Sequence, residues 1–219
     1  IDEWGTVNEP INYLLAAYGL AVFPPGGVTL DPQRFAVILR DYIAAHVAIY
    51  DAMMAIAGTH KPYAITPAAA AAGASAEAAV AEAAYRVLLG LFPNRTAQYQ
   101  SAYDTFMATI VAGSAKTQGM ALGAEVAAGI LALRANDGRS VALAAYVPGT
   151  APGQFRGVNP IGRPNSFIKP FSLVSNAQFR APGPPALTSA AYAADVNETK
   201  ALGSASSTTP ITTLTAAFR

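Results

Sequence analysis

The sequence predicts an all-α protein, a bundle of about six helices interrupted by one long irregular stretch. Apolar residues recur at helical spacing in several segments, much of the 53% hydrophobic content is alanine, and helix-capping residues flank these segments. Between residues 139 and 187, prolines and glycines alternate with aromatic residues, which predicts an ordered excursion wrapped over the bundle rather than a disordered linker. The predicted divisions are therefore a helical bundle over 1–138, an irregular wrap over 139–187 and C-terminal helices over 188–219.

The segment 31–58 is predicted to form the central helix of the bundle. Asp31 can cap it, Pro32 fits its first turn, and Gly58 suits a left-handed terminating position. Its apolar residues fall on every side, which is typical of a buried helix. The charged residues Arg40 and Asp51 lie about three turns apart, so each is expected to meet a partner elsewhere in the fold.

Three more helices are predicted between the central helix and the excursion. A short helical pattern between residues 4 and 23 precedes the central helix. Ser75 is expected to begin the second helix, which Phe92-Pro93-Asn94 stops. The third extends to Gly113, and Ser114 is expected to cap a fourth that runs to Arg134. The stripe of the third helix is Tyr99, Ala102, Tyr103, Phe106, Met107 and Ile110.

Small residues recur every four positions in the fourth helix, at Ala115, Gly119, Gly123 and Ala127. Such a row lets a neighbouring backbone approach closely, and the low helix propensity of glycine implies a packing reason for it. Asn136-Asp137-Gly138 is predicted to form a turn. Beyond the excursion, Thr188 or Ser189 is expected to cap a helix closed by Gly203, and a last helix is expected to start at Pro210.

Composition excludes several classes of function. A net charge of +1 gives no electrostatic case for nucleic acid or an anionic membrane surface, and the absence of cysteine excludes thiolate chemistry and disulfides. The longest apolar runs are too short or too interrupted to cross a bilayer, so a soluble chain without a membrane span is expected.

No catalytic, cofactor-binding or metal-binding constellation can be assembled from the sequence. His46 is interpreted as a core histidine bonded to a neighbour, and His60 as a solvated loop residue. The pair Asp195 and Glu198 is interpreted as a solvated surface. The tripeptides that begin at Asn94 and Asn197 match the glycosylation pattern, which is common by chance.

Several stretches, spread in order over nearly the whole chain, carry a resemblance to a known family: Arg40–Ala52, Lys61–Tyr63, Ala76–Leu88, Leu91–Pro93, Arg134–Gly138, Tyr146–Gly149, Pro152–Phe155, Lys169–Phe171, Gln178–Arg180, Pro184–Ser189 and Asn197–Gly203. Together they resemble the vanadium-dependent haloperoxidase family, within the type 2 phosphatidic acid phosphatase superfamily, especially its exported bacterial members.

The resemblance implies helical bundles around an oxyanion site that holds vanadate, or phosphate in the phosphatases. In the family a lysine, two arginines and a Ser-Gly-His segment neutralise the anion, and a further histidine binds the metal or attacks phosphorus. All of these residues belong to the C-terminal half of the family, so none is carried onto a position of this chain. Vanadate or phosphate is therefore expected only in that half.

The chain is therefore expected to be the N-terminal structural half of a haloperoxidase-like protein. Its expected partner is the C-terminal half of the same protein, and its expected localisation is secreted or periplasmic. The end of the sequence inside a predicted helix is interpreted as a truncation. Two alternatives stay open: an acid phosphatase of the same superfamily, and a non-catalytic helical protein that binds a partner or assembles as a homo-oligomer.

Overall fold

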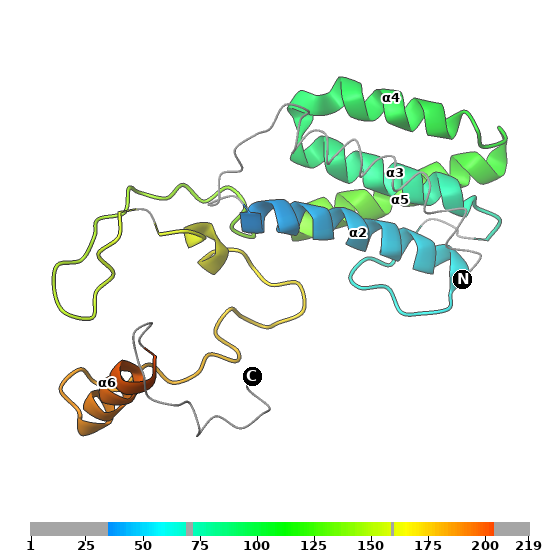
Figure 1. The fold of residues 1–219 in the computed structure, drawn as a ribbon. Coiled ribbons are helices and arrows are strands. Elements are labelled where there is room, and N and C mark those ends of the chain that lie inside the picture. Colours follow the sequence, from blue (N-terminus) through cyan, green and yellow to red (C-terminus); the bar gives the residue numbers. More distant parts are fainter. Residues whose placement is uncertain (1–34, 69–71, 159, 204–219) are drawn as a thin grey trace. The chain divides into compact units, whose positions relative to one another are not determined.

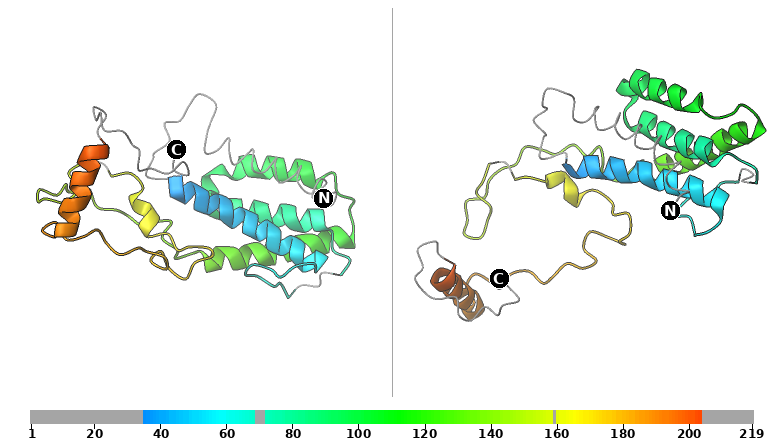
Figure 2. Two further views of the ribbon diagram at one scale, coloured as in Figure 1. Left: turned by 60° about the horizontal axis from the view of Figure 1, so that its bottom comes forward. Right: turned by 45° about the vertical axis from the view of Figure 1, so that its right-hand side comes forward.

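A computed structural model describes residues 35–68, 72–158 and 160–203, and this part of the chain is helical (Figures 1 and 2). It contains five α-helices and no strand. The helices are α2 (Phe35–Ala57), α3 (Ala76–Leu91), α4 (Thr96–Met107), α5 (Ser114–Leu133) and α6 (Ala190–Leu202), with two 3-10 helices, η2 (Pro93–Arg95) and η3 (Arg163–Ser166). The helices predicted near residues 4–23 and 210–219, and the predicted cap Asp31-Pro32, lie outside the described residues. None of the described helices combines the length and apolar content needed to cross a membrane.

The chain divides into two compact units. The first unit contains α2 to α5 together with residues 160–169, which include η3. The second unit takes residues 146–159 and everything from Pro170 onward, including α6. The predicted irregular stretch 139–187 is thus shared between the two units, and its wrapping over the bundle stays a prediction.

The centre of the first unit is α3, which corrects the expectation that α2 is central. Helix α3 contacts α2, α4 and α5, and Figures 1 and 2 show it between α2 and α4. All of its residues from Ala78 to Tyr85 are buried. Helix α2 instead leaves Leu39 and Ile43 exposed at 45% and 39%. The alanines of α3 let α2, α4 and α5 approach it, whereas α2 packs against α3 and α5 and leaves these two larger side chains exposed.

The row of small residues in α5 packs directly against α3, which confirms the predicted close approach of a neighbouring backbone. A Cβ added at Gly119 would lie 2.4 Å from the carbonyl oxygen of Ser75, and one at Gly123 would lie 2.2 Å from that of Ala79. No side chain fits at either distance. The two backbones are therefore in contact, and this packing fixes the α3–α5 pair at the core of the unit.

Most predicted helix ends are confirmed. Ser75 Oγ accepts from the Ala78 N–H, and Ser189 Oγ accepts from the Tyr192 N–H, so Ser189 rather than Thr188 caps α6. Gly58 ends α2 at φ +62°, in the left-handed region that glycine tolerates.

Two predicted ends around residues 107–114 are wrong. Helix α4 ends at Met107 rather than near Gly113, and Lys116 Nζ donates to the Met107 carbonyl at 2.6 Å. A cation placed at a helix C-terminus satisfies orphan carbonyls and favours that end point. Ser114 is the first residue of α5 and makes no side-chain capping bond, since Gly113 occupies the cap position.

Candidate functional site

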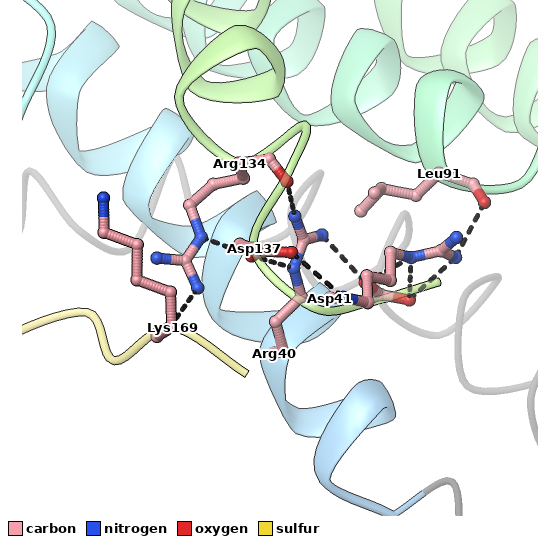
Figure 3. A network of polar contacts seen from close by, with 7 residues as sticks. Arg40, Asp41, Leu91, Arg134, Asp137 and Lys169 are labelled. Carbon is pink, nitrogen blue, oxygen red and sulfur yellow. Dashed lines mark hydrogen bonds and ion pairs between the residues drawn. The ribbon is translucent and has the colours of Figure 1, made fainter. Parts of the chain in front are cut away.

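The most extensive polar feature of the described chain is a buried cluster that we call the Arg40 network. It comprises the side chains of Arg40, Asp41, Arg134, Asp137 and Arg139 (Figure 3). Arg40 projects from the first half of α2 and is 3% exposed. Its Nε donates to Asp137 Oδ2 at 2.6 Å, one Nη to Asp41 Oδ1 at 2.9 Å and the other Nη to the Arg134 carbonyl at 2.8 Å. All three guanidinium nitrogens are therefore engaged.

Asp137 joins Arg40 to the chain that leaves α5. It lies three residues beyond Arg134 in the turn that follows the helix, and Arg134 Nε pairs with its Oδ2 at 2.7 Å. Arg134 Nη2 donates to the Lys169 carbonyl at 2.6 Å, and the Lys169 N–H donates to the Asp137 carbonyl at 2.8 Å. This turn thus holds residue 169 against the end of α5.

Gly138 is required for that close approach. Its φ is +90°, and an added Cβ would lie 2.0 Å from the Phe167 carbonyl oxygen. The turn predicted for Asn136-Asp137-Gly138 is confirmed, and Gly138 is the residue that lets segment 167–169 pass beside it.

Arg139 extends the network to the C-terminus of α3. Its Nε and Nη2 contact the two oxygens of Asp41 at 2.8 and 3.0 Å, and Nη2 also donates to the Leu91 carbonyl at 2.9 Å. The guanidinium carbon lies 5.3 Å from the centroid of the Phe92 ring, within range of a cation–π contact. A cation beside the last carbonyls of α3 also complements the helix dipole.

The network brings three cations and two anions together, and all of them are buried except Arg139, whose side chain is 24% exposed. Burial lowers the pKa of the Arg134 guanidinium, and the positive charge of Arg40 acts in the same direction, while Asp137 opposes both. Each carboxylate is shared between two arginines, so every buried charge is hydrogen-bonded within the protein. This arrangement fixes the relative positions of α2, the C-terminus of α3, the end of α5 and residues 167–169.

A second anchor centres on Asp51, which is fully buried in α2. Its Oδ1 accepts from the Tyr63 N–H at 2.5 Å, and its Oδ2 accepts from the N–H groups of Ala64 and Ile65 at 3.1 and 2.8 Å. One carboxylate therefore organises the loop between α2 and α3. The prediction that Arg40 and Asp51 meet separate partners is confirmed.

A third anchor centres on Glu82 of α3, which is buried and bonded to Tyr103 of α4. It accepts from the Tyr103 hydroxyl and from Arg86 Nε, and the rings of Tyr103 and Tyr85 stack with centroids 4.2 Å apart. Burial raises the pKa of Tyr103, and the hydrogen bond to Glu82 adds to this shift. Burial also raises the pKa of Tyr99 to about 12, and among the described residues its hydroxyl has no hydrogen-bond partner.

The other residues singled out in the sequence do not come together. His46 is only half-buried, so its interpretation as a core residue is wrong, although its Nδ1 lies 2.9 Å from the Tyr42 carbonyl oxygen as expected for a neighbour bond. His60 is exposed beside Thr59. Asp195 and Glu198 are exposed, as expected for a solvated surface, and Asn94 and Asn197 are exposed as well. Within the described ranges no group of three or more His, Asp or Glu side chains is arranged to hold a metal ion.

Sequence reasoning missed Asp41, Glu82, Asp137 and Arg139 as buried partners. One signal was available, since only 12% of residues are charged and a mostly apolar helix leaves few exposed positions for them. Asp41 and Glu82 both lie inside such helices. Asp137 and Arg139 follow a helix in a polar turn, where nothing in the sequence marks them as buried.

Comparison with known proteins gives no relative: no family model, no curated protein and no solved structure matches this chain.

Proposed function

We propose that this chain is the N-terminal, structural half of a vanadium-dependent haloperoxidase-like protein. In this proposal the partner is the C-terminal half of the same protein, which supplies the residues that bind vanadate. The whole protein then oxidises halide with hydrogen peroxide after export from the cell. The chain itself contributes no catalytic residue.

The proposal rests on the resemblance in sequence, and one structural observation supports it. Five of the separate stretches that carry the resemblance contribute residues to the two anchors. These residues are Arg40, Tyr63, Leu91, the pair Arg134 and Asp137, and Lys169. Residues up to 129 positions apart (169 − 40) therefore meet in one framework. This is the pattern expected if the shared residues preserve a scaffold rather than a reaction centre.

The finer features of the fold belong to the same proposal. A bundle of about six helices requires the segments near residues 4–23 and 210–219 to be helical. The stretch 139–187 then wraps the bundle and presents apolar side chains to the other half. Its described residues are nowhere buried, and Phe155 and Phe179 are 55% and 79% exposed.

The test is vanadate-dependent bromination of monochlorodimedone by the protein with its continuing sequence. We expect activity that requires vanadate, bromide and hydrogen peroxide together, and we expect none from residues 1–219 alone. A continuing sequence that lacks a Ser-Gly-His segment, or bromination that is independent of vanadate, contradicts the proposal.

An acid phosphatase of the same superfamily is the nearest alternative, and hydrolysis of p-nitrophenyl phosphate that vanadate inhibits would favour it.

The other alternative is a non-catalytic helical protein that binds a partner or assembles as a homo-oligomer. Its specific support is that each described buried charge is engaged by a protein group. A monodisperse chain of residues 1–219 that melts cooperatively would favour this alternative over a missing half.

A further inference from the structure

One segment of the first unit is flanked in the sequence, on both sides, by residues of the second unit. Residues 160–169, which we call the strap, belong to the first unit, whereas residues 146–159 and the chain from Pro170 onward belong to the second. The strap contains η3, which contacts α2. The chain therefore returns to the helical unit for the length of the strap only.

The strap is bonded to the end of α5 through its last residue. The Lys169 N–H donates to the Asp137 carbonyl at 2.8 Å, and the Lys169 carbonyl accepts from Arg134 Nη2 at 2.6 Å (Figure 3). Arg134 and Asp137 are themselves buried, at 4% and 2% exposed. These bonds close a loop whose ends lie 32 positions apart in the sequence (169 − 137).

The strap buries little apolar surface of its own. None of its residues is buried, and Ile161 and Phe167 are 74% and 51% exposed. Segments that make few buried apolar contacts open locally at a low free energy. A strap that polar bonds hold to a buried site can therefore detach while α3 and α5 remain packed.

The Arg40 network positions both groups that hold Lys169. Asp137 Oδ2 pairs with Arg40 and Arg134, so one carboxylate orients the Arg134 guanidinium and also fixes the residue whose backbone carbonyl accepts from Lys169. A guanidinium can contact a carboxylate and a carbonyl oxygen at the same time through its planar fork of donors. The single ammonium of a lysine, on a flexible stem, is less well placed to do both.

We propose that the strap opens as one local unit while α2 to α5 stay folded, and that the Arg134 guanidinium is the latch that keeps it closed. Opening breaks both bonds to Lys169 and lengthens the free chain between α5 and Pro170. The strap is thus a conformational device that controls how closely the chain leading into the second unit is held to the bundle. This inference does not depend on the proposed function.

Amide hydrogen exchange of the 219-residue chain, followed by NMR in increasing urea, tests the opening. The hydrogen-bonded Lys169 amide should be protected, and its exchange rate should stay nearly constant at urea concentrations below the unfolding transition, because local opening exposes little surface. The buried amides of α3 should exchange faster as urea rises, since they require the bundle to open. A Lys169 amide that shares the urea dependence of α3, or that is unprotected, overturns the proposal.

The substitution Arg134→Lys tests the latch, and Arg156→Lys at an exposed arginine is the matched control. Exchange at Lys169 should accelerate about tenfold in Arg134→Lys and clearly more than in α3, whereas the control should leave both rates unchanged. Equal acceleration at Lys169 and in α3, or none at Lys169, overturns the assignment of Arg134 as the latch.

A second variant displaces the strap without removing a charge. In Gly138→Ala the added Cβ would lie 2.0 Å from the Phe167 carbonyl oxygen, so the strap has to move away. Exchange at Lys169 should again accelerate more than exchange in α3. Equal acceleration at the two places would mean that the strap and the bundle open together, which contradicts the proposal even if Arg134→Lys does not fold.

Discussion

At the scale of single residues, the stability of this fold depends on charges that are buried and fully partnered. Asp51 shows the principle, because one carboxylate receives three backbone N–H groups from residues 63–65. Charge-assisted bonds of this kind are about twice as strong as neutral ones. Removing the carboxylate strands three donors at a part-buried site.

Asp51→Ala is expected to lower the free energy of unfolding by about 3 kcal/mol, since each stranded donor carries a desolvation penalty. Asp51→Asn should cost less because the amide oxygen can still accept. The measurement is urea unfolding followed by circular dichroism. Asp195→Ala, at an exposed position of α6, is the control and should stay within about 0.5 kcal/mol of the parent chain. An unchanged free energy of unfolding in the Asp51→Ala variant would mean that Asp51 does not hold the loop 59–67.

The Arg40 network predicts an ordering of losses that follows burial. Asp137→Ala leaves Arg40 and Arg134 without their shared carboxylate and should cost about 3–5 kcal/mol. Arg139→Ala should cost less, because its side chain is 24% exposed and the remaining Asp41 still pairs with Arg40. Chemical denaturation of both variants measures the two losses in the free energy of unfolding. A larger loss in Arg139→Ala than in Asp137→Ala would contradict the assignment of Asp137 as the central anion.

Tyr99 and Tyr103, two of the three buried tyrosines among the described residues, predict a loss of stability at alkaline pH. Their pKa values are raised in the folded protein, so above pH ~10 the unfolded chain releases the proton first. For Tyr99 the free energy of unfolding is therefore unaffected below pH ~10 and falls as pH rises from ~10 to about 12.

Substitution by phenylalanine separates the two tyrosines. Tyr99→Phe should be neutral or stabilising at pH 7, because its hydroxyl has no partner among the described residues, and it should weaken the alkaline loss. Tyr103→Phe should destabilise at pH 7, because it removes the donor to buried Glu82. Melting temperatures from pH 7 to 11 provide the measurement, and identical profiles for the two variants would be the contrary result.

At the scale of elements, backbone contact between α3 and α5 determines the core. Glycine is unfavourable in a helix by about 1 kcal/mol relative to alanine, so Gly119 and Gly123 weaken α5 in isolation. They are placed where α3 carbonyl oxygens leave no space for a Cβ. The close packing of the pair offsets the weaker intrinsic helix.

Gly123→Ala should lower the free energy of unfolding by about 2 kcal/mol, since the clash with the Ala79 carbonyl outweighs the gain in helix propensity. Gly90→Ala in α3 is the matched control. Its added Cβ would meet only the Leu131 side chain, which can rotate away, so a change under about 1 kcal/mol is expected. Equal losses at the two sites would show that propensity, and not backbone contact, sets the effect.

At the scale of the whole molecule, burial is unevenly distributed along the chain. Eleven of the sixteen residues of α3 are buried, whereas no described residue from 139 to 203 is. Local opening costs least where few apolar contacts are made. The two units should therefore differ in the free energy of their local fluctuations.

Hydrogen exchange followed by mass spectrometry should find the slowest amides in α3 and α5, intermediate rates in α4, and the fastest described amides in α6 and the stretch 170–187. The physical reason is that the ends of α6 are capped but none of its residues is buried. Exchange in α6 as slow as in α3 would reveal a stabilising surface over that helix.

The amino-acid sequence by itself determined the helical class, most helix boundaries, the cap residues Ser75 and Gly58, and the close-packing role of the small residues in α5. These features are local, because periodicity, capping and the steric freedom of glycine act within a few residues. Only the tertiary structure decided that α3 rather than α2 is the centre, and that Asp137, Arg139 and Glu82 are buried partners. Those outcomes depend on which helix faces meet and on pairs of polar groups far apart in the chain. When apolar residues lie on every side of a helix, its sequence does not indicate which side its neighbours cover.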